Sequence, residues 1–511
     1  MNQGGHWIAV GAMAAFGGSL FSGFHFDDYG MLQDPGVVSP GGWLRCWSLW
    51  QTRPLTWFTF WLNYQMVGRE PLLWHAVNLV LHVACAVVLY RLLRRMVPHA
   101  ALFAALIFAL HPIQAEPVDY VYARAILLST FFSLLAIDAW GGRPRPGYPL
   151  GPTPWSPPVL RECPPAHPWI SVAWFALAVL SKEECVTLPL VLALHSTRQR
   201  HLRKRIFPLT AMSGIALLAG IRVIAAIEVT GMKNIGANAG ISTLKYLSEQ
   251  GIAILRYFGL LIFPWFFSVD PQIPSPAWAW RWLAWAILLG LIAAAARRFR
   301  EVPAAFWILA GFILLIPSSS IFPAADLATD RRMYLPMLAF APAIALLLPR
   351  RRPGWMAIVG CLLAALSLER TYVWASDERL WGEAATEAPG KIRPIIQLSR
   401  AVPPEKALVL LREGERVAPD NPEIPTELAR VDLQLNRPAA ALAEAGRALA
   451  LTPHEAHALN NRGAVLLAMN QIAAARRDFL AALGVDPCLE EARANLERSG
   501  GIPRDAPRCV E

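Results

Sequence analysis

Long apolar runs alternate with short polar segments along the first three quarters of the chain. A helix rises about 1.5 Å per residue and needs roughly 20 apolar residues to cross a bilayer, and several runs approach this length. We therefore predict a polytopic membrane domain with about ten to twelve crossings, drawn from residues 7–24, 72–90, 100–110, 126–140, 169–195, 206–226, 252–267, 278–296, 306–316, 335–348 and 355–368.

Two of these runs leave the number of crossings open. The run at 169–195 is broken by the polar sequence S-K-E-E, so it is either one crossing or a hairpin with arms of about a dozen residues each. The run at 252–267 has no basic flank and either spans the membrane or lies at its surface. The Trp-rich segment 25–70 is expected to form short amphipathic helices on the membrane surface.

The basic residues indicate how the domain is oriented. Arg91, Arg94 and Arg95 follow the run at 72–90, and the positive-inside rule makes that end cytoplasmic. Asp27 and Asp28 lie at the start of the segment 25–70, which joins the opposite end of this run, so they are then outside. Only 16% of the residues are charged and the mean hydropathy is +0.37, as in a membrane protein. The net charge of +10 reflects this orientation, and no nucleic-acid partner is expected.

The last quarter of the chain repeats with a period of 34 residues. Pro419, Pro453 and Pro487 share this spacing, and so do Ala407, Ala441 and Ala475. Gly463, Phe479 and Ala482 stand where a helix-turn-helix repeat needs small and aromatic residues, which indicates about three tetratricopeptide repeats. The alternative is an unrelated Ala-rich helical tail. We predict an all-α chain, with a membrane domain at 1–375 and an α-solenoid at 386–500.

The seven cysteines form no CxxC pair and no ligand spacing, so no metal site is expected from them. Cys85, Cys185 and Cys361 lie in or beside apolar runs and are interpreted as packing residues. Cys488 and Cys509 lie in the polar tail. They could pair if that tail is outside the cytoplasm, and the sequence alone leaves this open.

Ionisable residues gather on the outer side of the predicted spans, where they are costly unless they function. Two adjacent carboxylates raise the pKa of one of them, which leaves a group able to take a proton, while Arg and Lys can bind phosphate. The candidates are Asp27 and Asp28; His111, Glu116 and Arg124; Lys182, Glu183 and Glu184; Arg331, Arg332 and Tyr334; and, as secondary candidates, Arg53, His75, Asn78 and His82.

Each set also has a structural interpretation. The two aspartates could be a solvated helix end, and Glu116 could form an ion pair with Arg124. Lys182 and Glu183 could pair with each other at a hairpin tip. The two histidines at 75 and 82 are better explained by hydrogen bonding in a core than by a metal. An acid combined with phosphate-binding groups at a membrane surface nevertheless favours transfer from a lipid phosphate.

Several motifs occur in an order that resembles a known family. They are F-D-D, R-P-L-T-x-x-T-F-x-L-N-Y, H-A-V-N-L-V-L-H, H-P-I-Q-A-E-P-V, A-R-A-I-L-L, L-S-K-E and R-R-M-Y-L-P. With the repeats, they resemble the integral-membrane O-mannosyltransferases that carry tetratricopeptide repeats, and their bacterial relatives. The resemblance implies the GT-C glycosyltransferase fold. It also implies transfer of a sugar, mannose in the animal enzymes, from a polyprenyl (dolichyl) phosphate to Ser or Thr of a protein.

The resemblance also implies roles for the candidates. Asp27 or Asp28 would be the general base of an inverting transfer. The remaining first-rank candidates would bind the donor sugar and phosphate, with His111, Glu116 and Arg124 lining the site and Lys182 with Arg331 or Arg332 on the phosphate. No cofactor is required, and a divalent metal stays open. Gln114 departs from the pattern, and three repeats are fewer than in the animal proteins, which puts the kind of acceptor in doubt.

Two rival functions stay open on the sequence. The acceptor could be a glycan or a lipid, and the chain could be a non-catalytic membrane scaffold whose repeats bind partners. A transporter is disfavoured, because the polar residues gather on one face and not at the midplane. We expect a multi-pass protein of a bacterial inner membrane, with its site and its repeats in the periplasm or outside and with the repeats recruiting a protein acceptor.

Overall fold

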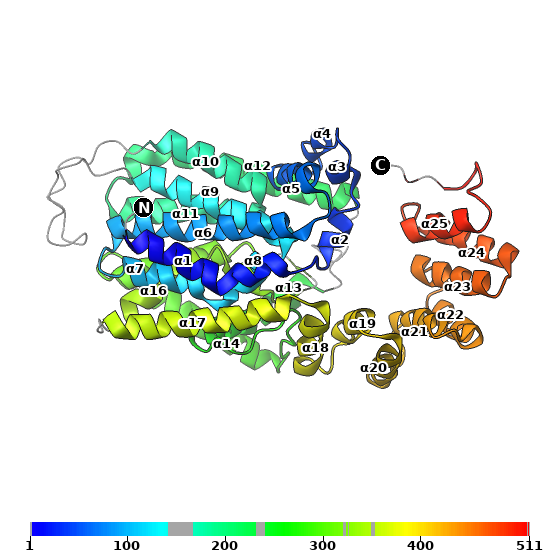
Figure 1. Cartoon of the computed structure of the whole chain (residues 1–511). Coiled ribbons are helices and arrows are strands. Elements are labelled where there is room, and N and C mark those ends of the chain that lie inside the picture. The colour runs from blue at the N-terminus through cyan, green and yellow to red at the C-terminus, as the bar shows by residue number, and fades with distance from the viewer. Residues whose placement is uncertain are drawn as a thin grey trace. The chain divides into compact units, whose positions relative to one another are not determined.

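The computed structural model describes residues 3–141, 167–230, 241–319, 323–324, 326–348, 353–507 and 509. The chain divides into two compact units, Met1–Ser376 and Asp377–Glu511 (Figure 1). All the named elements of the described part are helices, which confirms the all-α fold class. The second unit begins at Asp377, nine residues before the start expected at 386.

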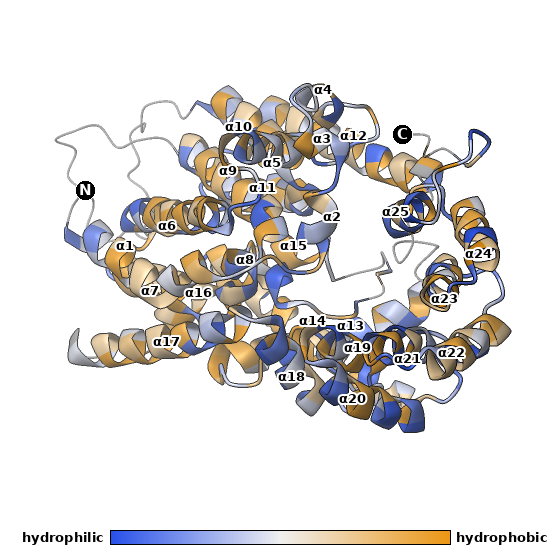
Figure 2. Cartoon of the chain, turned by 45° about the vertical axis from the view of Figure 1, so that its right-hand side comes forward, coloured by the Kyte–Doolittle hydropathy of each residue, from blue (hydrophilic) through white to orange (hydrophobic). Residues whose placement is uncertain are grey.

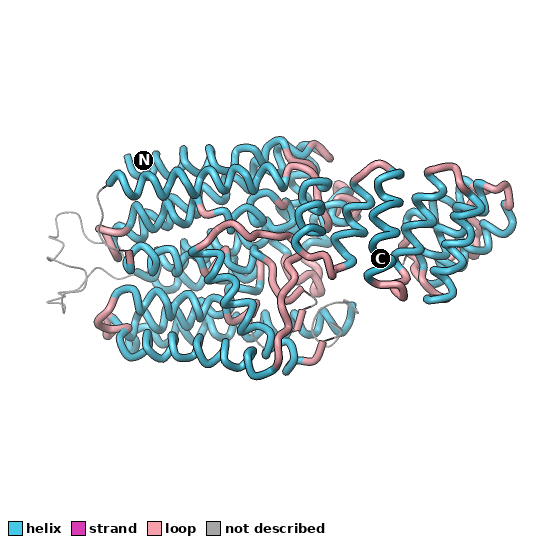
Figure 3. Tube along the Cα trace, turned by 90° about the horizontal axis from the view of Figure 1, so that it is seen from below, coloured by secondary structure: helices cyan, strands magenta, loops and turns pink. Residues whose placement is uncertain are grey.

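The first unit is a bundle of apolar helices that run side by side, with their loops at the two ends (Figures 1 and 3). In the described part, five helices are long and apolar enough to cross a membrane, and the bent pair Ala101–Leu110 and Pro112–Asp119 could be a sixth crossing. The shorter apolar helices are Pro168–Ser181, Pro303–Leu315 and Met337–Leu347. The expectation of ten to twelve crossings therefore exceeds the number of helices of spanning length, because polar breaks divide several runs.

The helices of the bundle follow one another in the order of the apolar runs. Their bounds are α1 (Gln3–Phe16), α6 (Pro71–Met96), α7 (Ala101–Leu110), α9 (Arg124–Gly141), α10 (Pro168–Ser181), α11 (Leu188–Arg198), α12 (Ile206–Thr230), α13 (Thr243–Ile262), α14 (Trp278–Arg298), α15 (Pro303–Leu315), α16 (Met337–Leu347) and α17 (Pro353–Trp374). The helices of the bundle are mostly hydrophobic along their length (Figure 2). Among the five long spans, α9 is the most enclosed, whereas α12 and α14 expose most of their apolar surface. In a membrane, lipid would cover that surface.

Helices α10 and α11 form the hairpin that the sequence offered as one alternative. The amide of His167, just before α10, donates to the carbonyl of Ala139 at 3.2 Å. At the far end of α11, the Ser196 hydroxyl accepts from the indole of Trp140 at 3.0 Å. Both arms therefore meet the same end of α9, and the short helix η4 (Glu183–Thr187) forms the tip at the opposite end of the bundle.

The segment after α1 folds into short helices, as expected. They are α2 (Asp27–Met31), α3 (Pro35–Val38), α4 (Trp43–Cys46) and α5 (Pro54–Val67). Trp43, Trp47 and Trp50 are exposed on this layer, while Trp61 donates its indole N–H to the Ser39 carbonyl at 3.0 Å. Exposed Trp beside polar backbone is typical of a membrane interface.

The second unit is a solenoid of paired helices. Its elements are α18 (Asp377–Glu387), α19 (Ile392–Ala401), α20 (Pro404–Val417), α21 (Glu423–Gln434), α22 (Pro438–Leu451), α23 (Ala456–Ala468), α24 (Ile472–Val485) and α25 (Glu490–Arg498). The turns within two pairs contain Asn436 and Asn470, 34 residues apart, both with positive φ, which Asn tolerates better than most residues.

Two further details of the solenoid answer expectations from the sequence. A Cβ on Gly463 would lie 2.6 Å from the ring of Phe479, so the small residue is what lets α23 and α24 approach. Cys488 and Cys509 form a disulfide, which settles the pairing that the sequence left open. Of the packing cysteines, Cys85 and Cys185 are buried, whereas Cys361 is exposed on α17, so its interpretation as a packing residue was wrong.

Candidate functional site

The two adjacent aspartates have different environments. Asp28 is fully buried, and its two oxygens accept the backbone N–H groups of His25 at 3.0 Å and Tyr122 at 2.8 Å. Burial raises the pKa of Asp28 to about 7, although both of these N–H groups oppose the shift. Asp27 is exposed and its carboxylate accepts from the hydroxyl of Tyr120 at 2.7 Å. Asp28 therefore anchors two loops, and Asp27 is the carboxylate that a substrate could reach.

Tyr120 comes from the polar break that follows α7. His111 ends α7, its ring accepts the amide of Ile113 at 3.2 Å, and the chain bends by 52° into α8 (Ala115–Asp119). Proline at 112 and the His111 cap together explain why this apolar run stops here. Burial and the neighbouring Asp27 carboxylate raise the pKa of Tyr120 well above its usual value, so its hydroxyl stays a donor.

Glu116, also on α8, holds Arg331. One carboxylate oxygen accepts the backbone N–H of Arg331 at 2.8 Å, and the other pairs with its guanidinium. Tyr120 directly follows α8 and donates to Asp27, so the partner of Arg331 and the partner of Asp27 belong to one short segment. The pair between Glu116 and Arg124, which the sequence offered as a structural alternative, does not form in the described part of the chain.

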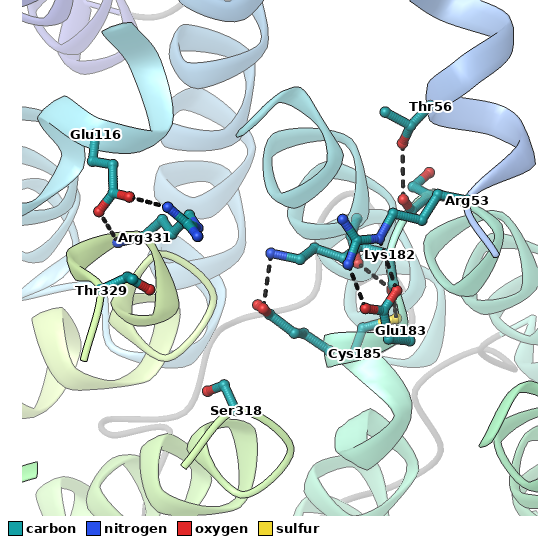
Figure 4. A network of polar contacts seen from close by, with 12 residues as sticks. Arg53, Thr56, Glu116, Lys182, Glu183, Cys185, Ser318, Thr329 and Arg331 are labelled. Atoms are coloured by element: carbon teal, nitrogen blue, oxygen red, sulfur yellow. Dashed lines mark hydrogen bonds and ion pairs between the residues drawn. The ribbon is translucent and has the colours of Figure 1, made fainter. Parts of the chain in front are cut away.

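The hairpin tip supplies a second group of charges. Arg53 forms a fork with Glu183, with N–O distances of 3.0 and 2.6 Å, and Lys182 pairs with Glu184 at 2.8 Å (Figure 4). Burial alone would raise the pKa of Glu183, but the Arg53 guanidinium outweighs it and holds the pKa at about 2, so this carboxylate is charged. Burial lowers the pKa of Lys182, while Glu184 opposes that shift.

Neighbouring elements fix this tip. The hydroxyl of Thr56 on α5 donates to the Ser181 carbonyl at 2.8 Å, and that of Ser129 on α9 donates to the Lys182 carbonyl at 3.3 Å (Figure 4). The Cys185 thiol donates to the same carbonyl at 3.4 Å. The backbone of the tip is thus held by two helices, α5 and α9, that are distant from it in sequence.

Packing contacts place the two groups at the same end of the bundle. Asp28 accepts the amide of Tyr122, and the Tyr122 ring stacks on Phe60 of α5 with centroids 6.0 Å apart. Helix α5 begins directly after Arg53, whose guanidinium pairs with Glu183 at the hairpin tip. The acids and the basic residues of the two groups therefore lie at one end of the bundle, and we call them together the polar network. The other end carries the basic cluster that follows residues 72–90, where Arg95 pairs with Asp138.

Some candidates lie outside this network. Arg124 is fully buried and donates to Asn78, Asn63 and the Trp74 carbonyl, at distances from 2.9 to 3.0 Å, with its guanidinium 5.0 Å from the ring of Phe60. Arg124 therefore connects α9 to α5 and α6 inside the bundle and does not line the site.

The remaining candidates also make structural contacts. His75 bonds to the Gly23 carbonyl at 3.0 Å, and Asn78 donates to the Tyr120 carbonyl at 3.0 Å. Tyr334 lies 2.9 Å from a ring nitrogen of His82 within the core. Arg332 donates to the carbonyls of residues 326 and 327 and to Tyr246, so most of its donors are occupied.

Sequence reasoning missed Tyr120 and Tyr122. Both lie in the segment D-Y-V-Y between the motifs H-P-I-Q-A-E-P-V and A-R-A-I-L-L. Two tyrosines, two residues apart and flanked by candidate residues, were the available signal. Tyr120 donates its hydroxyl to Asp27, and Tyr122 donates its amide to Asp28. Across the described ranges, no group of three or more His, Cys, Asp or Glu side chains is arranged to hold a metal ion.

Comparisons with known proteins give partial matches. No family model matches the chain. A mouse protein named protein O-mannosyl-transferase TMTC3 is 32% identical over 190 residues, which cover 34% of this chain and 19% of the relative. Human protein O-mannosyl-transferase TMTC4 is 32% identical over 161 residues, covering 25% and 22%. The match thus spans about a fifth of the length of these relatives.

A nematode (Caenorhabditis elegans) protein O-mannosyl-transferase, F38B6.6, is 39% identical over 90 residues, covering 17% of this chain and 13% of its own. Among solved structures, yeast Tom70 aligns over 81% of this chain and 88% of its own, with 13% identity and a TM-score of 0.23. That score is too low for a statement about the fold. The three relatives described above are all named as protein O-mannosyl-transferases.

Proposed function

We propose that the chain is a membrane glycosyltransferase that moves a hexose, mannose in the first instance, from a polyprenyl phosphate to a Ser or Thr hydroxyl of a protein. The observation that carries the proposal is the network just described. The proposal is supported by one exposed carboxylate, Asp27, and by the basic side chains of Arg53, Lys182 and Arg331, each held by its own partner at the same end of an apolar bundle. The names of the relatives support a protein as the acceptor.

The proposed reaction is a direct displacement. Asp27 takes the proton of the acceptor hydroxyl, and that oxygen attacks the anomeric carbon of the sugar. The bond between this carbon and the phosphate oxygen breaks, the configuration inverts, and the polyprenyl phosphate leaves with the bonding electrons. Positively charged side chains placed where negative charge develops lower the barrier. Lys182 and Arg331 supply that charge, and their paired carboxylates keep them in place.

We assign different roles to the charged residues of the network. Arg53 presents a planar fork of the kind that binds phosphate through two donors, but Glu183 occupies that fork in the described structure. We assign Arg53 to positioning the tip and Lys182 to the phosphate. Glu116 holds Arg331 through both its backbone and its side chain, so Arg331 is oriented before the donor binds.

The proposed site is extracytoplasmic. Helix α17 ends at Trp374, which stacks on Tyr120, so the chain leaves the bundle at the end that carries Asp27. The segment that follows contains the disulfide between Cys488 and Cys509, and disulfides persist in oxidising compartments. In a bacterial cell this side is the periplasm. The helical repeats that follow would recruit or orient the protein acceptor.

Mass spectrometry of envelope and secreted proteins tests this function. Cells that lack the chain should lose a hexose on Ser or Thr of specific proteins, and wild-type chain should restore it. Asp27→Asn should lower transfer by about 10²–10⁴-fold, the usual contribution of a general base. Asp138→Asn, an acid near the cytoplasmic end, is the matched control and should restore the modification.

The outcomes separate the proposal from its rivals. If Asp27→Asn restores the hexose fully at the wild-type protein level, the catalytic assignment is wrong. If no protein loses hexose but an envelope glycan or lipid does, the acceptor is wrong. A scaffold would tolerate Asp27→Asn and would fail when residues 386–511 are deleted.

A further inference from the structure

Phe26, immediately before the proposed base, has an unusual backbone conformation. Its φ is 45° and its ψ is −114°, a combination that bulky L-residues rarely adopt. Conformations of this kind persist only where the surrounding structure holds them, and they occur preferentially at functional sites. The question is therefore what holds Phe26, and what its conformation does for Asp27.

Two aromatic side chains from distant parts of the chain hold this residue. The Phe26 ring lies edge-on to Tyr120, with centroids 5.5 Å apart, and edge-on to Trp374 at 6.1 Å. Trp374 in turn stacks on Tyr120, with centroids 6.1 Å apart and the planes at 23°. We call Phe26, Tyr120 and Trp374 the aromatic clamp. Tyr120 and Trp374 are each only 2% exposed, so neither is placed for contact with solvent.

The clamp connects directly to the carboxylate. The Tyr120 hydroxyl accepts the backbone N–H of Asp27 at 3.2 Å and donates to its Oδ2 at 2.7 Å. A single hydroxyl thus fixes both the backbone and the side chain of the residue. Its position depends on the ring, and the ring is fixed by the stack with Trp374.

We propose that Trp374 is a positioning residue for the transfer reaction, acting through Tyr120 to hold Asp27 against the unfavourable backbone of Phe26. This inference rests on the proposed function, because it takes Asp27 as the base. Trp374 touches neither the carboxylate nor the basic side chains of the network in any contact described. Loss of its ring lets the Phe26 backbone relax and turns the carboxylate away, while the phosphate-binding residues keep their own partners.

The separation of these contacts predicts a kinetic signature. Arg331 and Lys182 are held by Glu116 and Glu184, so binding of the lipid donor does not depend on the clamp. A displacement of about 1 Å at a reacting group costs on the order of a hundredfold in rate. Trp374→Leu should therefore lower kcat by about 10–100-fold and leave the KM for the donor within about twofold.

The test uses the full chain in lipid nanodiscs, with mannosyl-phosphoryl-polyprenol as donor and with envelope proteins from cells lacking the chain as acceptor. Initial rates at several donor concentrations give kcat and KM per folded molecule. Trp374→Phe keeps an aromatic ring and should recover most of kcat. Trp140→Leu is the matched control, because Trp140 is equally buried but lies at the other end of α9, so it should change only the yield of folded protein.

The outcomes distinguish this inference from the function on which it rests. If wild-type protein transfers mannose and Asp27→Asn does not, but Trp374→Leu and Trp374→Phe keep the wild-type kcat, Trp374 only fills space and the inference is wrong. If Trp374→Leu does not fold, Trp374→Phe and Tyr120→Phe decide, and a wild-type kcat in both overturns it. If wild-type protein transfers no mannose, the proposed function fails and the inference fails with it.

Discussion

Replacing Arg124 with methionine tests whether this arginine is structural, although its motif first suggested a place in the site. Its guanidinium donates to Asn78, Asn63 and the Trp74 carbonyl at 2.9 to 3.0 Å, and to the Thr59 carbonyl at 3.4 Å. Methionine keeps an apolar stem but leaves the side-chain oxygens of Asn78 and Asn63 without this donor, whereas the Trp74 carbonyl inside α6 keeps its bond within the helix. Each buried acceptor left unpaired costs about 1–3 kcal/mol, and partial relaxation brings the total to roughly 3–5 kcal/mol.

Thermal unfolding of the purified chain measures this effect. At about 2 °C per kcal/mol for a large unit, Arg124→Met should lower Tm by about 5–10 °C. Arg124→Lys keeps the charge but lacks the planar fork that reaches several acceptors at once, so its Tm should fall by a similar amount. Arg222→Met is the matched control. Arg222 also donates to backbone carbonyls, at residues 48, 49 and 51, but largely at the surface, so its Tm should change little.

Donor kinetics decide the alternative. If Arg124 bound phosphate, Arg124→Met would keep the wild-type Tm and raise the KM for the donor, and that result would refute the structural assignment. The full burial of the side chain is the reason we expect the opposite.

Three further results are expected. The pKa of Asp28 is 3.8 in the unfolded chain and about 7 in the folded chain, so between these pH values the folded state binds one more proton than the unfolded state. The free energy of unfolding should therefore fall by up to about 4 kcal/mol as pH rises from 4 to 7. In Asp28→Asn, thermal unfolding should show a Tm that changes much less over the same pH range. Arg53→Lys keeps the charge but loses the two-point contact with its carboxylate partner, so the hairpin tip loosens and kinetics should show the donor KM raised about tenfold. Gly463→Val places a branched side chain against the ring of Phe479 and should destabilise the repeats by about 1–3 kcal/mol, which limited proteolysis would detect as faster cleavage. A Cβ at Gly446 meets open space, so Gly446→Ala should leave the cleavage rate unchanged.

The fold was largely predictable because its signals are local. The 34-residue spacing fixed the repeats, and the bounds of most apolar helices follow the hydropathy of their own residues. Helix α13 shows where this fails, because it begins at Thr243, in the polar stretch between the apolar runs at 206–226 and 252–267. Its polar residues are buried by distant partners. Gln250 donates to the carbonyl of Leu327, and Glu249 accepts from Ser275. No local pattern reveals such partners.

The site was predictable as a set of residues but not as a division of roles. The motifs contain two doublets, Asp27–Asp28 and Arg331–Arg332, and the sequence treats the members of each as equivalent. Neighbouring residues in a helical turn point about 100° apart, so they cannot share one environment. In both doublets the first member faces the polar network and the second anchors the backbone. Asp28 accepts two backbone N–H groups, and Arg332 donates to two backbone carbonyls.

This arrangement gives each doublet a physical rationale. A reactive side chain at a loop needs its backbone held, and the adjacent residue is the nearest place for a group that can hold it. The anchoring partner of Asp28 is the amide of Tyr122, 94 residues along the chain. The sequence shows that two residues of one kind are adjacent. Which of them reacts is set by a contact that exists only once the two loops have come together.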